Sequence, residues 1–179
     1  IDMSRRTVAA NAALTGIGRT RRVLLGDTML QNFSRDEVET VFAHELGHHV
    51  HGDIWKGLAL EVMGIWVGLY LLQTVVRPLF LETGLGDISA LANLPLLILL
   101  GEVASLALMP AANAVSRWRE ARADAFAARV SANPEAYASA LYRLARQNLA
   151  ELWPPRWVEL LLYSHPAIGR RVEKVRGET

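Results

Sequence analysis

The sequence predicts a mainly α-helical protein with one small β-hairpin and two apolar helices long enough to cross a lipid bilayer. Apolar residues recur at helical spacing through most of the polar part of the chain, as amphipathic helices require. Two long stretches, 57–76 and 88–116, contain one charged residue each, Glu61 and Glu102. Because a helix needs about 20 apolar residues to cross a bilayer core, we expect one transmembrane helix over 57–76 and a second within 88–116.

The basic residues indicate how these two helices would be oriented. Of the 19 Lys and Arg residues, only Arg77 lies between the two apolar stretches. Basic residues are retained on the cytoplasmic side of a membrane. We therefore expect both termini and the polar part of the chain in the cytoplasm. The alternative is a soluble protein in which the two apolar helices are buried.

The hairpin and the first helix are predicted from local signals. Val8–Thr15 and Arg22–Met29 are short apolar or mixed runs separated by glycines and a basic turn, as two hairpin strands would be. Ser34 followed by Glu37 is a capping box. It predicts a helix that begins near Arg35 and runs at least to Val50.

Four further helical segments are predicted after the second apolar stretch. They cover Arg117–Val130, a helix capped by Asn133 with Pro134 in its first position, Arg156–Tyr163, and a last helix that ends near Arg176. The helix after Asn133 carries Tyr137 and Leu141 at helical spacing.

Composition restricts the chemistry that the protein can perform. The chain has no cysteine, which excludes disulfides and thiolate metal ligands. Any bound metal must therefore be held by His, Asp or Glu side chains. The net charge of +1 gives no indication of a nucleic-acid partner.

The strongest chemical signal is an H-E-x-x-H motif formed by residues 44–48. In a helix, His44 and His48 lie on one face, so both imidazoles can reach one metal ion. Glu45 cannot bind in the same way, but it can take a proton from a metal-bound water. Zinc lowers the pKa of such a water to about 7. The motif and its capped helix predict a zinc peptidase.

A catalytic zinc site needs a third protein ligand and one open position. His49 and His51 follow the motif, but His49 lies on the wrong helical face, and we interpret both as surface or interface residues. The third ligand must then be His165 or a later carboxylate. Glu120 and Asp124 lie four residues apart, which suits either a metal site or a surface helix with ion pairs to its neighbouring arginines.

At this point the chain resembles the integral-membrane zinc peptidases that include the CAAX prenyl endopeptidase and the bacterial heat-shock membrane protease. Four blocks of residues carry the resemblance, in the family's order. They are the hairpin with Asn11-Ala12, Gly16, Gly18 and 22–28, the metal helix 43–48, Ser116-Arg117-Trp118-Arg119-Glu120 with Ala123-Asp124, and Ser164-His165-Pro166 with Arg171-Val172. The two apolar stretches lie between the second and third blocks.

The resemblance implies a fold and a role for each matching residue. It implies one zincin-like peptidase domain over 1–179, with the two membrane helices inserted between the metal-binding helices. Glu120 becomes the third ligand to a single Zn²⁺. Asp124 would orient a zinc-bound imidazole. His165 would donate to the oxyanion, Arg171 would pair with a carboxylate, and Asn11 would contact the substrate backbone.

The function predicted from the motif and the resemblance is a zinc-dependent endopeptidase that hydrolyses membrane-associated or misfolded proteins. We expect a peptide or protein substrate, a lipid bilayer as partner, and an integral protein of the bacterial inner membrane with its site on the cytoplasmic side. A non-catalytic zinc-binding membrane scaffold is the alternative. Gly64 and Gly68 either let another helix approach, which would allow an oligomer, or are chance glycines. We interpret Glu61 and Glu102 as structural residues.

Overall fold

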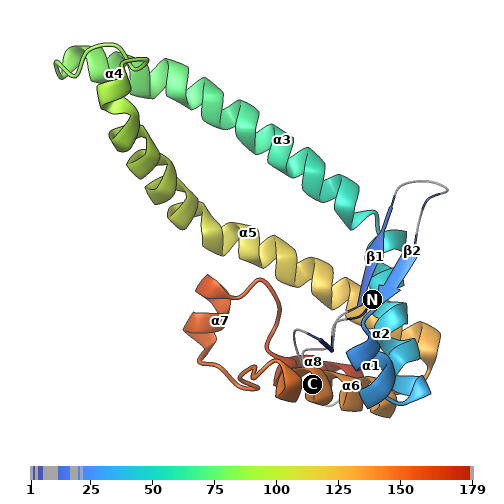
Figure 1. Ribbon diagram of the computed structural model, residues 1–179. Coiled ribbons are helices and arrows are strands. Elements are labelled where there is room, and N and C mark those ends of the chain that lie inside the picture. Colours follow the sequence, from blue (N-terminus) through green and yellow to red (C-terminus); the bar gives the residue numbers. More distant parts are fainter. Residues whose placement is uncertain (1, 3, 6–11, 17–19, 21, 178–179) are drawn as a thin grey trace. The chain divides into compact units, whose positions relative to one another are not determined.

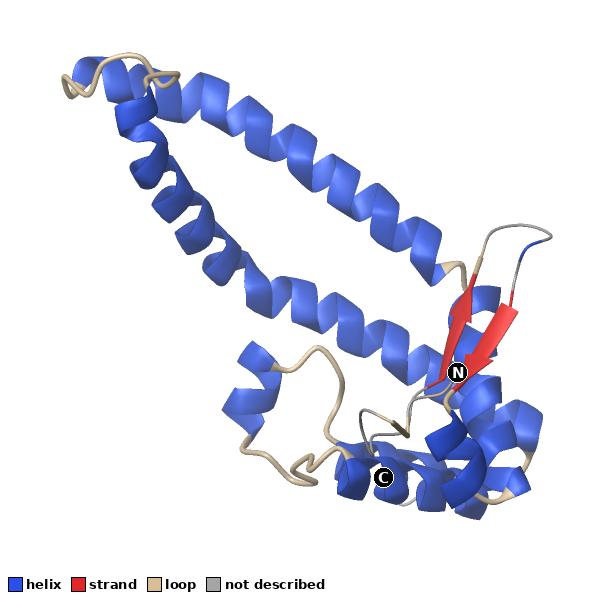
Figure 2. Cartoon of the chain, in the orientation of Figure 1, coloured by secondary structure: helices blue, strands red, loops and turns tan. Residues whose placement is uncertain are grey.

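A computed structural model describes residues 2, 4–5, 12–16, 20 and 22–177 of the chain. The chain divides into two compact units (Figure 1). One contains Ile1–Asp53 and Ala111–Thr179, and the other contains Ile54–Pro110. Among the described residues, most belong to helices and the strands form a single small sheet (Figure 2). The predicted fold class, mainly helical with a small hairpin, is therefore confirmed.

The sheet of the first unit consists of two short antiparallel strands. Strand β1 (Ala12–Thr15) pairs with β2 (Arg22–Leu25), so that Ala12 lies opposite Leu25. The prediction that the second strand continues to Met29 is wrong, because β2 ends at Leu25 and helix α1 (Asp27–Asn32) begins two residues later. The Asp27 carboxylate accepts a hydrogen bond of 3.0 Å from the backbone N–H of Thr28. A negative side chain in the first turn stabilises a helix start.

Helix α2 (Arg35–Val50) begins at the predicted capping box. The backbone N–H of Glu37 donates to Ser34 Oγ at 3.2 Å, and the backbone N–H of Ser34 donates to Glu37 Oε2 at 2.7 Å. The other carboxylate oxygen of Glu37 accepts from Ser139 Oγ at 2.6 Å and lies 3.3 Å from Arg143 Nε. The cap therefore also fixes the start of α2 to helix α6 (Pro134–Gln147).

Helix α5 (Leu94–Ser131) is one continuous helix, where the sequence suggested an apolar stretch followed by a separate helix. Its part in the first unit packs closely against α2. A Cβ atom added at Gly47 would lie 3.1 Å from the Cα of Ala123 and 3.3 Å from the Cβ of Phe126. The two helices can approach this closely because Gly47 has no side chain.

The hydrophobic core of the first unit is completed by helices that follow α5. Asn133 caps α6, as predicted, and its Oδ1 accepts from the backbone N–H of Ala136 at 3.0 Å. After α6 come α7 (Arg156–Leu162) and α8 (Ile168–Arg176). Buried residues of α2, α5, α6 and α8 form one hydrophobic cluster: Ala43, Ala127, Tyr137, Ala138, Leu141 and Val172. This core holds α2 and α5 in the arrangement that the site requires.

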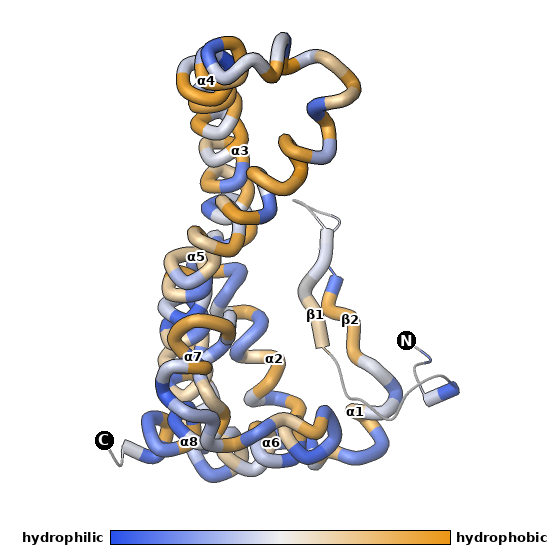
Figure 3. The backbone as a smooth tube through the Cα atoms, turned by 90° about the vertical axis from the view of Figure 1, so that its left-hand side faces the viewer, coloured by the Kyte–Doolittle hydropathy of each residue, from blue (hydrophilic) through white to orange (hydrophobic). Residues whose placement is uncertain are grey.

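The second unit contains α3 beyond Asp53, the first part of α5, and the elements between them. Helix α3 (Asp53–Leu71) is followed by a π-helical turn (Leu72–Val76), α4 (Arg77–Glu82) and a 3₁₀ turn (Leu91–Asn93). The hydropathy colouring shows how apolar these elements are (Figure 3).

Two helical segments, Asp53–Glu82 and Leu91–Ser131, are long and apolar enough to cross a membrane. Their most apolar windows are 0% and 6% buried within the chain. The alternative predicted two apolar helices buried in the protein, but within the described part of the chain these helices are not buried. Glu61 and Glu102 are both exposed, and space is open around the Cα atoms of Gly64 and Gly68.

Candidate active site

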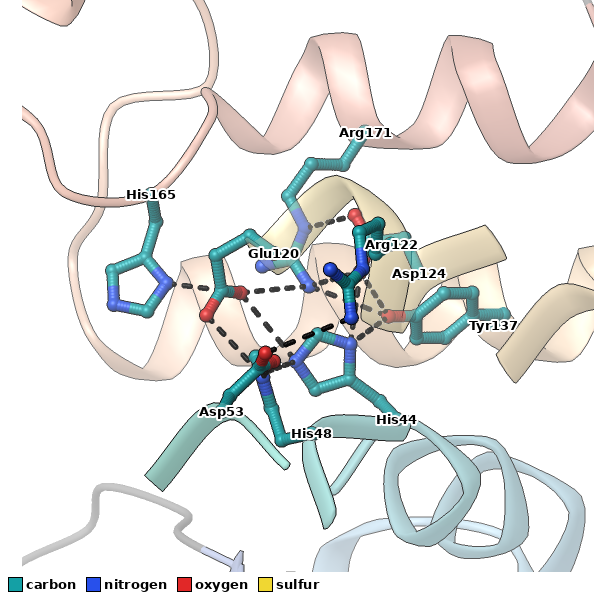
Figure 4. Close-up of polar contacts among 9 residues, drawn as sticks. All are labelled: His44, His48, Asp53, Glu120, Arg122, Asp124, Tyr137, His165 and Arg171. Atoms are coloured by element: carbon teal, nitrogen blue, oxygen red, sulfur yellow. Dashed lines mark hydrogen bonds and ion pairs between the residues drawn. The ribbon is translucent and has the colours of Figure 1, made fainter. Parts of the chain in front are cut away.

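Three side chains from α2 and α5 converge on one point in the first unit (Figure 4). His44 and His48 lie on one face of α2, and their Nε2 atoms are 3.2 Å apart. Glu120 of α5 completes the group, with one oxygen 3.4 Å from Nε2 of His44 and the other 3.2 Å from Nε2 of His48. The structure therefore brings together the three residues that were predicted as ligands.

The spacing of these atoms suits a zinc ion. Donor atoms held about 2.0–2.1 Å from zinc at tetrahedral angles are separated from one another by about 3.3 Å. The separation of 3.2 Å between the two Nε2 atoms matches that value, and each imidazole has one of the two Glu120 oxygens at a similar distance of 3.2 or 3.4 Å. Imidazole nitrogen and carboxylate oxygen are ordinary zinc ligands. Both the geometry and the chemistry of the donor set therefore fit the ion.

The outer nitrogen of each imidazole faces a carboxylate. Nδ1 of His44 lies 2.9 Å from Asp124 Oδ1, and Nδ1 of His48 lies 2.9 Å from Asp53 Oδ2. A carboxylate can only accept a hydrogen bond, so Nδ1 carries the proton in both rings. Each Nε2 is thereby left to bind a metal ion once it is deprotonated.

Asp124 is in turn held by Arg171 and Tyr137. The Arg171 guanidinium donates to both carboxylate oxygens, from Nη2 at 2.7 Å and from Nε at 2.9 Å. The Tyr137 hydroxyl donates to Asp124 Oδ1 at 2.6 Å and lies 2.9 Å from Nδ1 of His44. All of these groups are buried or nearly so. The family resemblance implied a carboxylate pairing for Arg171, whereas Tyr137 had no role in the predicted site.

The electrostatics of the cluster favour charged groups. Hydrogen bonding to Glu120 is the main reason that the pKa of His48 is raised to about 9; burial opposes this effect and the hydrogen bond to Asp53 adds to it. Burial alone would raise the pKa of Asp124, but Arg171 and His44 outweigh it and lower that pKa. Since a metal ligand must be deprotonated, zinc binding to His48 would release a proton.

Glu45 lies beside the three candidate ligands without being one of them. It lines a cavity of about 370 Å³ together with His44, Glu120 and His165. Ala12 of strand β1 lines the same cavity, so the sheet borders the site. Burial raises the pKa of Glu45, and the neighbouring imidazoles oppose that shift. A carboxylate with a raised pKa is better matched to proton transfer near neutral pH.

His165 reaches the site from the segment that follows α7. Its Nδ1 lies 3.0 Å from Glu120 Oε2, while its side chain remains 61% exposed. His49 and His51 stay outside the cluster, and the His51 ring meets Phe126 edge to face at 6.0 Å between centroids. Asn11, the predicted substrate contact, lies outside the described residues.

Comparison with known proteins decides the family. The family model described as "Peptidase family M48" matches residues 1–179. The chain belongs to peptidase family M48. This confirms the family that the four sequence blocks predicted.

Several relatives of this M48 chain cover nearly all of it. An uncharacterized metalloprotease, YhfN of Bacillus subtilis, is 35% identical over 99% of the chain and 43% of that protein. A CAAX prenyl protease 1 homolog of Oryza sativa is 32% identical over 96% of the chain and 41% of that protein. Protease HtpX of Pseudoalteromonas atlantica is 29% identical over 93% of the chain and 61% of that protein.

The fold has a match among solved structures. The crystal structure of S. mikatae Ste24p superposes on this M48 chain with a TM-score of 0.81 at 25% identity, over 98% of the chain and 44% of Ste24p. The chain thus spans between about two fifths and about three fifths of the length of the relatives that it matches.

Proposed function

We propose that this M48 chain is a zinc-dependent endopeptidase whose single Zn²⁺ is held by His44, His48 and Glu120. The convergence of these three side chains carries this proposal, with the two Nε2 atoms 3.2 Å apart and a Glu120 oxygen 3.2–3.4 Å from each of them. When bound, zinc lowers the pKa of a coordinated water to about 7 and so supplies the nucleophile. The remaining steps depend on residues of the chain.

Glu45 is the proposed general base and acid. It lines the cavity beside the ligands, and burial raises its pKa. It would take a proton from the attacking water and pass that proton to the amine that leaves. His165, also in the cavity lining, would donate to the substrate oxygen that becomes negative during attack.

The outer contacts keep the two imidazoles in position. Asp124, fixed by Arg171, orients His44, and Asp53 orients His48. Such outer partners raise the basicity of a ligand and select its tautomer. Their burial keeps these contacts away from competing water.

The proposed substrates are membrane-associated or misfolded proteins. An extended peptide could lie beside β1, because that strand borders the cavity and a strand edge can pair with a peptide backbone. Asn11, directly before β1 in the chain, would contact the same backbone. The apolar stretches 57–76 and 88–116, which lie mostly within the helical segments Asp53–Glu82 and Leu91–Ser131, would cross the bacterial inner membrane. The distribution of Lys and Arg would place the site on the cytoplasmic side.

The test of this function is the Glu45→Gln variant in the full chain. We expect it to retain bound zinc but to lose at least about 10²-fold in peptide cleavage, the low end of what a general acid–base residue contributes. Glu39→Gln, an exposed position on the same helix, is the matched control and should cleave normally. A phenanthroline chelator should abolish cleavage by both Glu39→Gln and the unchanged protein.

Two results would contradict the proposal. Undiminished, chelator-sensitive cleavage by Glu45→Gln would remove Glu45 from the mechanism. Zinc binding without any cleavage of casein or of membrane-anchored peptides by the unchanged protein would favour the non-catalytic zinc scaffold.

A further inference from the structure

Helix α7 turns its acidic residue inward and three large apolar residues outward, the reverse of what is expected for a surface helix. Trp157, Leu160 and Leu161 are spaced as one helical face, and they are 64%, 53% and 44% exposed. Glu159 lies on the opposite face and is buried. A surface helix in water normally turns its apolar face to the core and its charges outward.

Hydrogen bonds within the first unit hold the buried acidic residue on the inward face of α7. Glu159 accepts from the backbone N–H of Ala167 at 2.9 Å and from Arg170 Nε at 2.6 Å. Because these bonds neutralise and hold Glu159, α7 cannot simply rotate to bury its leucines. The apolar face is therefore a stable outer surface of the folded protein.

Helix α7 is also fixed to the end of the apolar part of α5. Asn113 Nδ2 donates to the carbonyl of Leu161 at 2.9 Å. Arg117 Nη1 donates to the carbonyls of Glu159 and Tyr163 at 3.1 and 2.7 Å. Arg117 is the first basic residue after the apolar stretch 88–116. A helix that leaves a membrane presents its first basic residues at the headgroup level, so α7 would lie at that level too.

We propose that α7 lies on the bilayer surface and inserts Trp157, Leu160 and Leu161 into the boundary between headgroups and acyl chains. Tryptophan favours this boundary because its ring is apolar and its N–H is polar. Arg156, exposed at the start of α7, can pair with phosphate groups of the lipids. The occupant of this face is therefore phospholipid.

The position of α7 would bring the bilayer surface close to the catalytic cavity. Only Tyr163 and Ser164 separate the end of α7 from His165, which contacts Glu120 at 3.0 Å. The cavity would then receive polypeptide segments at the point where they leave the membrane. This consequence rests on the proposed peptidase function, whereas the insertion of α7 does not.

The absence of cysteine allows a direct test, since a single introduced cysteine gives one labelling site. The full-length Leu161→Cys chain is labelled with an environment-sensitive fluorophore and reconstituted into vesicles of phosphatidylethanolamine and phosphatidylglycerol. Some vesicles also contain a lipid with a nitroxide near the headgroup end of its acyl chain. Glu39→Cys, an exposed site on α2, is the control.

We expect the nitroxide lipid to quench the label at 161 and to leave the label at 39 almost unchanged. Aqueous iodide should quench the label at 161 at least about threefold less than the label at 39. If iodide quenches both labels equally, α7 faces water and the proposal is wrong. If neither quencher reaches position 161, protein covers the face, and the proposal is wrong as well.

A second variant tests the consequence for catalysis. Leu160→Glu combined with Leu161→Glu should lower kcat/KM for a membrane-anchored peptide at least about fivefold and leave kcat/KM for the same free peptide unchanged. Equal effects on both peptides would contradict the link between α7 and substrate delivery. The quenching experiment involves no catalysis, so failure of the proposed function would not be mistaken for failure of membrane insertion.

Discussion

Oδ2 of Asp53 lies 2.9 Å from Nδ1 of His48. The second histidine of the motif therefore contacts the first residue of the next helix, α3. Between α2 and α3, Gly52 adopts a φ of +66°, a left-handed conformation that glycine takes without strain. This turn brings Asp53 back against His48. Oδ1 of Asp53 lies 3.8 Å from Arg122 of α5. One carboxylate therefore connects the imidazole of a proposed zinc ligand with α3 and α5.

Asp53→Ala should weaken zinc binding about 10- to 100-fold, the usual effect of removing such an outer partner. His48 would lose the acceptor that fixes its tautomer and its ring orientation. Asp53→Asn should have a smaller effect, because its amide oxygen can still accept from Nδ1. Zinc affinity would be measured by competition with a chromophoric chelator, and Glu39→Ala is the control. The same affinity in Asp53→Ala and Glu39→Ala would rule out this role.

Removing Arg171 should destabilise the fold far more than removing a similar arginine at the surface. Arg171→Met leaves the buried Asp124 carboxylate without its bidentate partner, and breaking a buried ion pair costs about 3–5 kcal/mol. For a chain of this size we expect the midpoint of thermal unfolding to fall by roughly 10 °C. Arg171→Lys keeps the charge but loses the planar guanidinium that binds both carboxylate oxygens. Its midpoint of thermal unfolding should therefore lie between those of Arg171→Met and the unchanged protein.

The control for Arg171 is Arg176→Met. Arg176 donates to Glu135 at 2.7 Å, as short a contact as that of Arg171, but Glu135 is 70% exposed. Exposed pairs contribute about 0–1 kcal/mol. Both variants would be unfolded in the presence of a chelator, so that zinc binding does not add to stability. A similar fall in the unfolding midpoint of both variants would show that the Asp124–Arg171 pair does not stabilise the fold through its burial.

Much of the site could be predicted because its signals are local in the sequence. The capping box and the H-E-x-x-H spacing each lie within a few residues, and helical geometry alone places His44 and His48 together. The placement of Glu120 and Arg171 followed from the family resemblance. From spacing alone, Glu120 and Asp124 were equally consistent with a surface helix.

Contacts between distant segments could not be predicted. Tyr137 is 93 residues from His44, and its spacing in α6 indicated only an apolar helix face. Asp53 reaches His48 through the left-handed turn at Gly52, for which the dipeptide Gly52-Asp53 was the only available signal. The second strand ended earlier than predicted because α1 begins at Asp27, whose carboxylate accepts from the backbone N–H of Thr28, and such a local hydrogen bond competes with strand formation in a short apolar run.

The contribution of Glu37 to stability should depend on pH. Burial alone would raise the pKa of Glu37, but hydrogen bonds from Ser139 and Ser34 and the charge of Arg143 outweigh it and lower the pKa below 4.5. The ionised form is therefore favoured in the folded state. Its stabilising effect is complete above the unfolded pKa of about 4.5 and is lost as pH falls through the lower folded value.

Glu37→Gln tests this linkage. The variant should be less stable than the unchanged protein at pH 7, and the difference should shrink as pH falls below about 4.5. Chemical unfolding at a series of pH values would measure it, with the exposed Glu39→Gln as control. A stability difference that is constant across this pH range would show that the hydrogen-bonding shape of Glu37 matters rather than its charge.

Gly47 should limit how closely α2 and α5, which carry the proposed zinc ligands, can pack. A Cβ at this position would lie 3.1 Å from the Cα and 3.2 Å from the carbonyl oxygen of Ala123, which are backbone atoms that cannot simply rotate away. Gly47→Ala gains up to about 1 kcal/mol of helix propensity, and this gain should offset part of the crowding.

Gly47→Val and Gly47→Leu also gain helix propensity, but their larger side chains add crowding that this gain does not offset, and they should separate α2 from α5. Because His48 and Glu120 lie on these two helices, a shift of about 1 Å would move them out of the 3.2 Å spacing that suits zinc. We expect zinc affinity to fall in the order Gly, Ala, Val, Leu, and overpacking to reduce stability by about 1–3 kcal/mol in the larger variants. Zinc titration and thermal unfolding of the series would measure both effects. Undiminished zinc affinity in Gly47→Leu would show that the donor spacing does not depend on this close helix contact.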